Sequence, residues 1–338
     1  MFKVPFKSAL AATALAVCTL VADPSARAAE IECEFAFYGG ANYGDEAARK
    51  RFGFVPVEGL CISGYLHGNI AKGDFDKVLA FFRQNYPMLA YVILWSPGGD
   101  VDEAIKIGRL LRKYLVSTRA PSSIGTMNSL LGHVRPPIAP SGPDPRAFDP
   151  TKPFRVEGED KDRPPLILPE LGSLCSGPDC VCASACALIW FGGVDRSGDV
   201  GVHRPRSTDP QFTALPATEA VIAYRRVLDG IETYLRDMEV PRPIIDTMVA
   251  TGSAEIKWVD SIEDDLERPP SFAEWQDATC GAETKEESKA FAHLISREAK
   301  TLSQTESLLL KTLREKVDNR IHCQRHLRGQ QILQLPRP

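Results

Sequence analysis

One stretch of the sequence constrains the fold more than any other: an apolar run that leads through a glycine turn into an amphipathic helix. Residues 90–95, Ala-Tyr-Val-Ile-Leu-Trp, are continuously apolar, which is typical of a strand buried on both faces. Ser-Pro-Gly-Gly follows at residues 96–99, and residues 101–116 then carry apolar side chains at helical spacing. A buried strand that passes directly into such a helix predicts an α/β domain with a largely parallel sheet.

Patterns on both sides of this unit extend the prediction. Residues 54–66 are rich in strand formers, and residues 74–85 repeat apolar side chains with a helical period. The later part of the chain continues with predicted regular structure at residues 182–191, 200–202, 218–238 and 242–250. We therefore place the main domain at residues 29–268.

Two further segments depart from this rhythm. Residues 117–172 are crowded with prolines, and a loop of that length inside a compact domain is uncommon. We interpret it as an insertion that lies over the domain. Residues 269–338 predict a helical C-terminal extension, because residues 285–327 carry an apolar stripe among many charges. Such a helical arm would pack either on the domain or on a second subunit.

The first 28 residues predict a secretory signal peptide. Basic residues lie within residues 1–7, an apolar run covers residues 8–22, and Ala26-Arg27-Ala28 supplies the small residues of a cleavage site. Cleavage after Ala28 would send the chain to the periplasm or the medium. An uncleaved membrane anchor is the alternative, but the apolar run is shorter than the about 20 residues that a spanning helix needs.

The charge balance argues against nucleic-acid binding. The chain has 40 Lys and Arg and 44 Asp and Glu, of which three basic residues and one acidic residue fall within residues 1–28. The rest of the chain is therefore acidic, with a net charge of −6. A basic patch or stripe is the usual footprint of a nucleic-acid-binding protein.

Cysteine usage agrees with export. Nine cysteines are present, and removing Cys18 with the signal peptide leaves an even set of eight, which favours disulfides in an oxidising compartment. A zinc site among the four central cysteines is the competing interpretation, but no histidine lies close to them and the spacing lacks two knuckles. We expect no metal and no cofactor. Our predicted pairs are Cys33–Cys61, Cys280–Cys323, and pairing within the set Cys175, Cys180, Cys182 and Cys186.

Three short motifs could carry chemistry, and they occur in a fixed order. The first is the Ser-Pro-Gly-Gly turn at residues 96–99, whose glycines let backbone N–H groups approach a ligand. The second is Ala183-Ser184-Ala185, where small neighbours leave the hydroxyl accessible. The third is His203 at the end of a short strand, followed by Pro205. Taken singly they fit a plain turn, a helix N-cap and a buried histidine.

Together the three motifs resemble the ClpP/crotonase superfamily, and in particular exported serine peptidases related to the Clp protease proteolytic subunit. The resemblance covers residues 54–116 and 180–265. It implies a ClpP/crotonase-like fold of repeated ββα units with a largely parallel sheet. Here that fold would carry the proline-rich insertion and the helical extension.

The resemblance also implies roles for individual residues. Ser184 would be the nucleophile and His203 the base, while the N–H groups of Gly99 and Ala185 would stabilise the oxyanion. The third member of a triad is less well matched by the sequence. The candidate acids are Glu255, which we prefer, followed by Asp246 and Asp260.

The function that these roles imply is that of a periplasmic serine hydrolase, a peptidase acting on peptide or protein substrates. The resemblance further implies a homo-oligomer. We expect no ATPase partner, because ATP is absent outside the cytoplasm. The alternative is a non-catalytic binding or assembly protein on the same fold. A crotonase-type hydratase is disfavoured, because coenzyme A is cytoplasmic.

Overall fold

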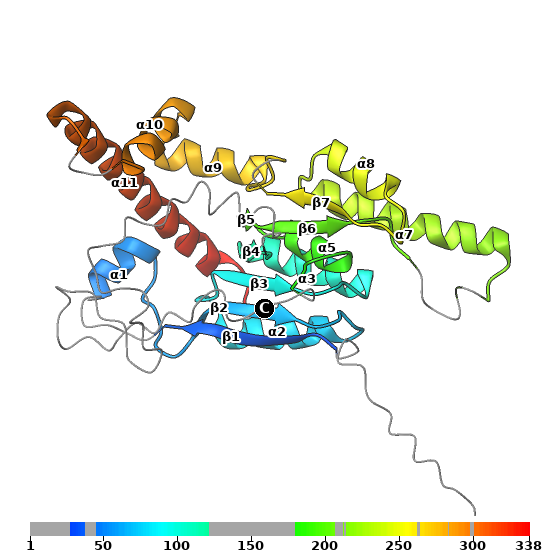
Figure 1. Ribbon diagram of the computed structural model, residues 1–338. Coiled ribbons are helices and arrows are strands. Elements are labelled where there is room, and N and C mark those ends of the chain that lie inside the picture. Colours follow the sequence, from blue (N-terminus) through cyan, green and yellow to red (C-terminus); the bar gives the residue numbers. More distant parts are fainter. Residues whose placement is uncertain are drawn as a thin grey trace, which may run out of the picture.

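A five-stranded sheet forms the centre of the molecule (Figure 1). The computed structural model describes residues 28–37, 45–121, 180–206, 212, 214–261, 264–282, 284–297 and 301–338. The strands lie in the order of the chain: β1 (Glu30–Ala36), β2 (Cys61–His67), β3 (Tyr91–Trp95), β4 (Ser117–Arg119) and β5 (Arg196–Ser197). β1 pairs antiparallel with β2, and the other neighbours are parallel. The predicted α/β class with a largely parallel sheet is confirmed.

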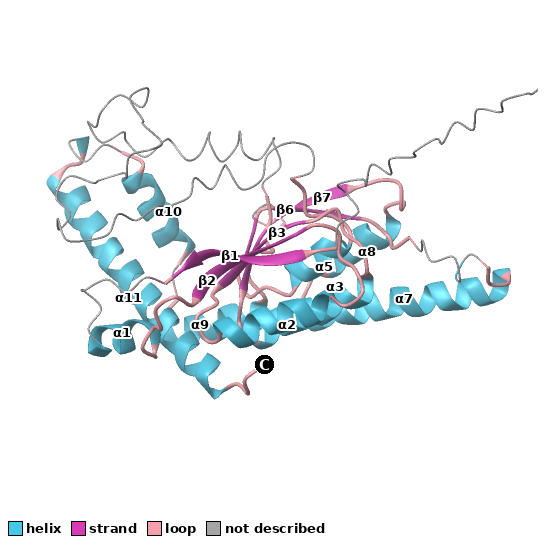
Figure 2. Cartoon of the chain, turned by 90° about the horizontal axis from the view of Figure 1, so that it is seen from below, coloured by secondary structure: helices cyan, strands magenta, loops and turns pink. Residues whose placement is uncertain are grey.

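Two crossover helices join the parallel strands. α2 (Asp74–Asn85) links β2 to β3, and α3 (Val101–Lys113) links β3 to β4. Both lie along one face of the sheet (Figure 2), where their apolar stripes join the core. α3 begins at Asp100, whose side chain accepts a hydrogen bond from the N–H of Glu103 at 2.9 Å, so a carboxylate N-cap ends the Ser-Pro-Gly-Gly turn.

A second, antiparallel pair of strands lies beside the main sheet. β6 (Asp199–Val202) pairs with β7 (Lys257–Asp260). The short extended segment Cys182–Ala183 joins the two sheets, because Cys182 pairs with Ser96 beyond β3 and Ala183 pairs with Gly201 in β6. α5 (Ala185–Phe191) starts directly after this segment, and α7 (Ala217–Asp237) and α8 (Arg242–Ala250) follow β6.

α5 is held by unusually close packing. Every one of its residues is buried, as its fully apolar sequence predicts. A side chain at Gly192 would overlap the backbone of Gly108 in α3, so the two helices approach to backbone contact. The hydroxyl of Tyr234 in α7 donates a hydrogen bond to the carbonyl of Leu188 at 2.7 Å. Neighbouring helices therefore fix α5 along its length.

The C-terminal region is helical and packs on the domain. Its helices are α9 (Pro270–Cys280), α10 (Lys285–Ile295) and α11 (Gln304–Gln334), and α10 lies beside α11 (Figure 1). α11 packs against α1 (Asp45–Phe52), where Gly329 meets the last turn of α1. The chain ends against α2, since the Arg83 Nε donates to the carbonyl of Pro338 at 2.9 Å. The sequence patterns predicted neither α1 nor β1.

Disulfides join the predicted cysteines. Cys33–Cys61 and Cys280–Cys323 are bonded, with Cα–Cα distances of 5.7 and 5.6 Å. Within the central set, Cys182 is bonded to Cys186, with their Cα atoms 5.2 Å apart, and Cys180 is disulfide-bonded as well. These bonds indicate an oxidising compartment.

Some predictions fall on residues outside the described part. The signal peptide up to residue 27 lies outside it, as does the segment interpreted as an insertion from residue 122 to 172. Residues 117–119, the first of that segment, form β4, which is too short to leave a pattern in the sequence. Among the described residues, no helix combines the length and the apolar character that a membrane span requires.

Candidate functional site

A cleft of about 630 Å³ brings three of the predicted site residues together. Gly99, Ser184 and His203 all line it. One wall is the loop of residues 69–72 that follows β2, and another is α7, through Tyr224 and other side chains. The cleft therefore opens where the loops after β2, β3 and β6 meet, next to the start of α5.

Ser184 sits in a strained turn at the edge of this cleft. Its φ is 58° and its ψ is −123°, a conformation that non-glycine residues rarely adopt. The turn is tight because the extended segment ends at Ala183 and the helix begins at Ala185. The N–H of Ser184 donates to the carbonyl of Gly201 at 2.8 Å, and its own carbonyl accepts from the N–H of Ala187 at 3.0 Å. The N–H of Ser184 thus takes part in the strand pairing, and its carbonyl takes part in the first turn of the helix.

A disulfide closes this turn covalently. Cys182 precedes Ser184 by two residues and Cys186 follows it by two, and the bond between them spans the strained position. Both cysteines are fully buried, whereas Ser184 is half-buried and faces the cleft. The paired cysteines are therefore part of the frame around the hydroxyl and are not free thiols.

The glycine turn packs against Ser184. Gly98 and Gly99 have φ values of 112° and 137°, which glycine tolerates at little cost. A side chain at Gly98 would collide with Ser184, and one at Gly99 would collide with the backbone of Ile70. Ile70 bonds to the carbonyl of Gly98 and to the N–H of Asp100, each at 2.8 Å, so the N–H of Gly99 takes no part in this pairing.

Ala185 is the first residue of α5 and is buried. An N–H at this position has no acceptor within its own helix. The N–H groups of Gly99 and Ala185 thus belong to the two backbone segments that border Ser184. Their role as oxyanion donors stays a prediction.

His203 follows β6 and is half-buried in the cleft wall. Its Nδ1 lies 2.8 Å from the carbonyl oxygen of Arg204. A carbonyl oxygen can only accept, so Nδ1 is the donor, and in the neutral ring Nε2 then has the lone pair. That is the tautomer a general base needs. Among the described residues, no hydrogen bond joins the Ser184 hydroxyl to the His203 ring.

Among the described residues, no hydrogen bond or ion pair joins His203 to any of the three candidate acids. Asp246 pairs with Arg242 on α8 at 2.7 Å. Asp260 in β7 lies opposite Asp199 of β6 in the strand register, at the end of the two-stranded sheet away from His203. Glu255 is exposed in a turn just before β7, at the same end as His203. Within the described part of the chain, the polar partner of the His203 ring is the backbone of Arg204.

Two buried carboxylates that the motifs did not point to support the loop at residues 69–73. Asp74 accepts the N–H of Ala71 at 2.7 Å. Glu103 accepts the N–H groups of Gly73 and Phe75 at 3.1 and 2.9 Å. Burial alone raises the pKa of Glu103, but bonds from Lys106, Phe75 and Gly73 outweigh it and lower the pKa. An acid in the first turn of each of two consecutive helices was the available sequence signal.

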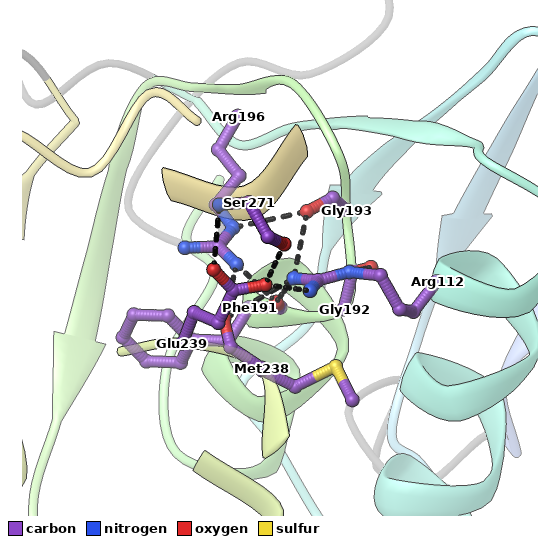
Figure 3. Close-up of polar contacts among 8 residues, drawn as sticks. All are labelled: Arg112, Phe191, Gly192, Gly193, Arg196, Met238, Glu239 and Ser271. Carbon is purple, nitrogen blue, oxygen red and sulfur yellow. Dashed lines mark hydrogen bonds and ion pairs between the residues drawn. The ribbon is translucent and has the colours of Figure 1, made fainter. Parts of the chain in front are cut away.

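Two arginines secure the opposite end of α5 (Figure 3). Arg196 is buried and donates to the carbonyls of Phe191, Gly193 and Met238 at 2.7, 3.1 and 2.9 Å. Arg112 donates to the same three carbonyls and to that of Gly192, at 3.2 to 3.4 Å.

Glu239 is the acid that lies beside this arginine pair in the described part of the chain. Burial, and then the neighbouring Arg112, lower the pKa of Arg196. Glu239 lies 3.6 Å from the Arg112 guanidinium and accepts the N–H of Ser271 at 2.8 Å. Cations suit the carbonyls at a helix C-terminus, so the pair anchors α5 at the end away from Ser184.

Comparison with known proteins returned no match: no family model, no curated protein and no solved structure corresponds to this chain.

Proposed function

We propose that the protein is a serine hydrolase, and specifically a peptidase, on a ClpP/crotonase-like fold. The observation that carries the proposal is Ser184. It holds a strained backbone conformation at the start of a buried helix, inside a cleft that it shares with His203 and Gly99. Strain of this kind is retained where the surrounding structure enforces it, and it concentrates at active sites.

The geometry supports a specific sequence of steps. Nε2 of His203 takes the proton of the Ser184 hydroxyl as the oxygen attacks a substrate carbonyl. The N–H groups of Gly99 and Ala185 stabilise the oxyanion, and losing one such donor typically costs about 2.7–4 kcal/mol. The protonated His203 then passes its proton to the leaving group, and water hydrolyses the acyl-enzyme by the same route.

The carbonyl of Arg204 takes over part of the work of a triad acid. It holds the His203 ring in the required tautomer. A neutral carbonyl stabilises an imidazolium less than a carboxylate does, so this pair acts more slowly than a full triad. Glu255 lies at the correct end of the β6–β7 pair and remains our preferred acid, ahead of Asp246 and Asp260.

The lining of the cleft suits a peptide. Lys72 and Arg206 supply positive charge, Asp100 and Asp102 supply negative charge, and aromatic and aliphatic side chains complete the wall. Mixed polarity of this kind can bind both the backbone and varied side chains of an extended chain. The volume of about 630 Å³ lies in the ordinary range for ligand sites.

We further propose that the protein acts in the periplasm after cleavage behind Ala28. The N–H of Ala29 donates to the buried Asp74 carboxylate at 3.1 Å, and the carbonyl of Ala29 accepts from Lys77 at 3.1 Å. Cleavage at this bond would place a cationic amino terminus beside Asp74, where a charge-assisted hydrogen bond replaces a neutral one. N-terminal sequencing of the exported protein tests this, and a first residue other than Ala29 would reject it.

Active-site labelling tests the proposed activity. The purified protein is incubated with a fluorophosphonate probe between pH 6 and 9. We expect covalent labelling that Ser184→Ala abolishes and that Ser253→Ala, a second serine of the same cleft, leaves intact. Absence of labelling at Ser184 across this range would exclude the hydrolase. Cleavage of a quenched-fluorescent peptide library then tests whether the hydrolase is a peptidase.

A non-catalytic binding or assembly protein is the second candidate. It is favoured by the lack, among described residues, of a hydrogen bond between Ser184 and His203 and of an acid on His203. In that case peptides would bind the cleft of the wild-type protein and of Ser184→Ala equally, without turnover. A homo-oligomer fits both proposals. Light scattering of the purified protein tests it, and a monomer mass at all concentrations would reject it.

A further inference from the structure

A second cavity, of about 400 Å³, lies where α11 and α1 meet the start of β3. It is separate from the cleft and shares no lining residue with it. We call it the arginine pocket. Four aromatic rings and several aliphatic side chains give it an apolar wall, and three guanidinium groups interrupt that wall. The rings are Phe37, Phe52, Phe54 and Tyr91, and the guanidinium groups belong to Arg51, Arg325 and Arg328.

The charge of this lining has one sign. Among the described residues that line the pocket there is no aspartate or glutamate. The cleft differs, because it carries two basic and two acidic side chains. An apolar cavity whose described side chains bring three guanidinium groups is complementary to an anion that has an apolar body.

Arg328 is a residue of this lining whose hydrogen-bonding capacity is not fully satisfied among the described residues. Its Nη2 donates to the carbonyl of Ala90 at 2.7 Å and to that of Leu115. Its Nε is buried and has no acceptor among the described residues. The part of the chain that the structure describes offers Arg328 no ion pair, and burial lowers the pKa of its guanidinium. Buried charges in proteins are normally paired, because an unpaired one is costly.

We propose that the arginine pocket binds a small amphiphilic carboxylate, of which a medium-chain fatty acid is the simplest case. The hydrocarbon chain would lie on the aromatic wall, and the carboxylate would meet the guanidinium groups. Guanidinium and carboxylate match in shape and form strong charge-assisted hydrogen bonds. Because α11 and α1 supply part of the pocket, the ligand would also tie the C-terminal helix to the domain.

Calorimetric titration of the full chain with decanoate tests the proposal. We expect saturable binding of one decanoate per chain. Octanoate, which has two fewer methylene groups, should bind about 15-fold more weakly, since each buried methylene contributes about 0.8 kcal/mol. Decyltrimethylammonium has the same chain and the opposite charge, so it should not bind. Equal binding of the cationic and anionic probes, or no binding of decanoate, would overturn the proposal.

Variants test whether decanoate binds in the arginine pocket. Arg328→Met could fail to fold, because Arg328 supports two backbone carbonyls, so the test uses the double variant Arg51→Gln/Arg325→Gln. We expect it to weaken decanoate binding about tenfold, roughly threefold for each partly exposed charge. Arg314→Gln, an exposed change on the same helix outside the pocket, is the matched control and should have no effect. Equal affinity of the two variants would reject the site.

Discussion

The two ends of α5 differ in backbone strain, in exposure and in the contacts that hold them. At the start, Ser184 holds a positive φ, faces an open cleft and is spanned by a disulfide. At the end, the helix carbonyls are covered by two guanidinium groups in a buried network. The first end holds a strained backbone conformation, and the second end is held by hydrogen bonds. The difference shows how a seven-residue helix can present a strained serine: its other end leaves it no freedom to shift.

The largest effect on this arrangement is expected at the secured end. Arg196→Met removes three hydrogen bonds to buried carbonyls, and we expect the free energy of unfolding to fall by about 3 kcal/mol. Urea denaturation measures this. Arg109→Met is the control, because its ion pair with Asp237 is exposed and should contribute less than about 1 kcal/mol. Equal losses for both variants would mean that the carbonyl network does not anchor α5.

A smaller effect on stability, with a distinct effect on reactivity, is expected at the strained end. Cys182→Ala/Cys186→Ala opens a loop of sequence separation 4, which predicts a loss of about 2 kcal/mol from chain entropy. We also expect fluorophosphonate labelling of Ser184 to slow about tenfold, because the freed turn relaxes away from its strained conformation, whose cost is of order 1–3 kcal/mol.

The disulfide at Cys280 and Cys323 provides the matched control. It closes a loop of sequence separation 43, so Cys280→Ala/Cys323→Ala should cost more stability, about 4 kcal/mol on the same model. Labelling of Ser184 should nevertheless continue at the wild-type rate. If both variants slow labelling in proportion to their loss of stability, the Cys182–Cys186 bond has no special role at the serine.

Features of the site that short sequence motifs mark could be predicted, and features that depend on tertiary contacts could not. The glycine turn, Ser184 and His203 could be singled out because short motifs mark the ends of strongly apolar elements, and the structure brings Gly99, Ser184 and His203 into one cleft. The carbonyl of Arg204 could not, because any residue supplies a backbone carbonyl and the sequence does not show which one a ring meets. Arg196 was also missed, since β5 has two residues and leaves no periodic pattern.

The same distinction between local patterns and tertiary contacts applies to the fold. α2 and α8 were predicted with the bounds they have, because each carries a clear helical period. β1 alternates acidic and apolar residues at the antiparallel edge of the sheet, and α1 is short and highly charged. Their contacts, with β2 and with α11, join parts of the chain that no local pattern relates.

The smallest effect is expected at Glu103, which supports the loop at residues 69–73. Its carboxylate is buried and bonded, and its pKa in the folded chain is lowered. An acid with a depressed pKa stabilises the fold fully above its unfolded value, about 4.3, and this contribution disappears as the pH falls through the lower folded value. Glu103→Gln should therefore cost about 1 kcal/mol at pH 7 and progressively less in more acidic solution.

Urea denaturation of the wild type and of Glu103→Gln at pH 7, 4 and 3 follows the difference. Glu274→Gln, an exposed change on α9, should show no such trend. Because Glu103 holds the N–H groups of Gly73 and Phe75, its loss should also loosen the cleft wall at residues 69–73. That should lower labelling of Ser184 less than opening the Cys182–Cys186 bond does. A difference in stability that stays constant with pH would show that Glu103 contributes through packing rather than through its charge.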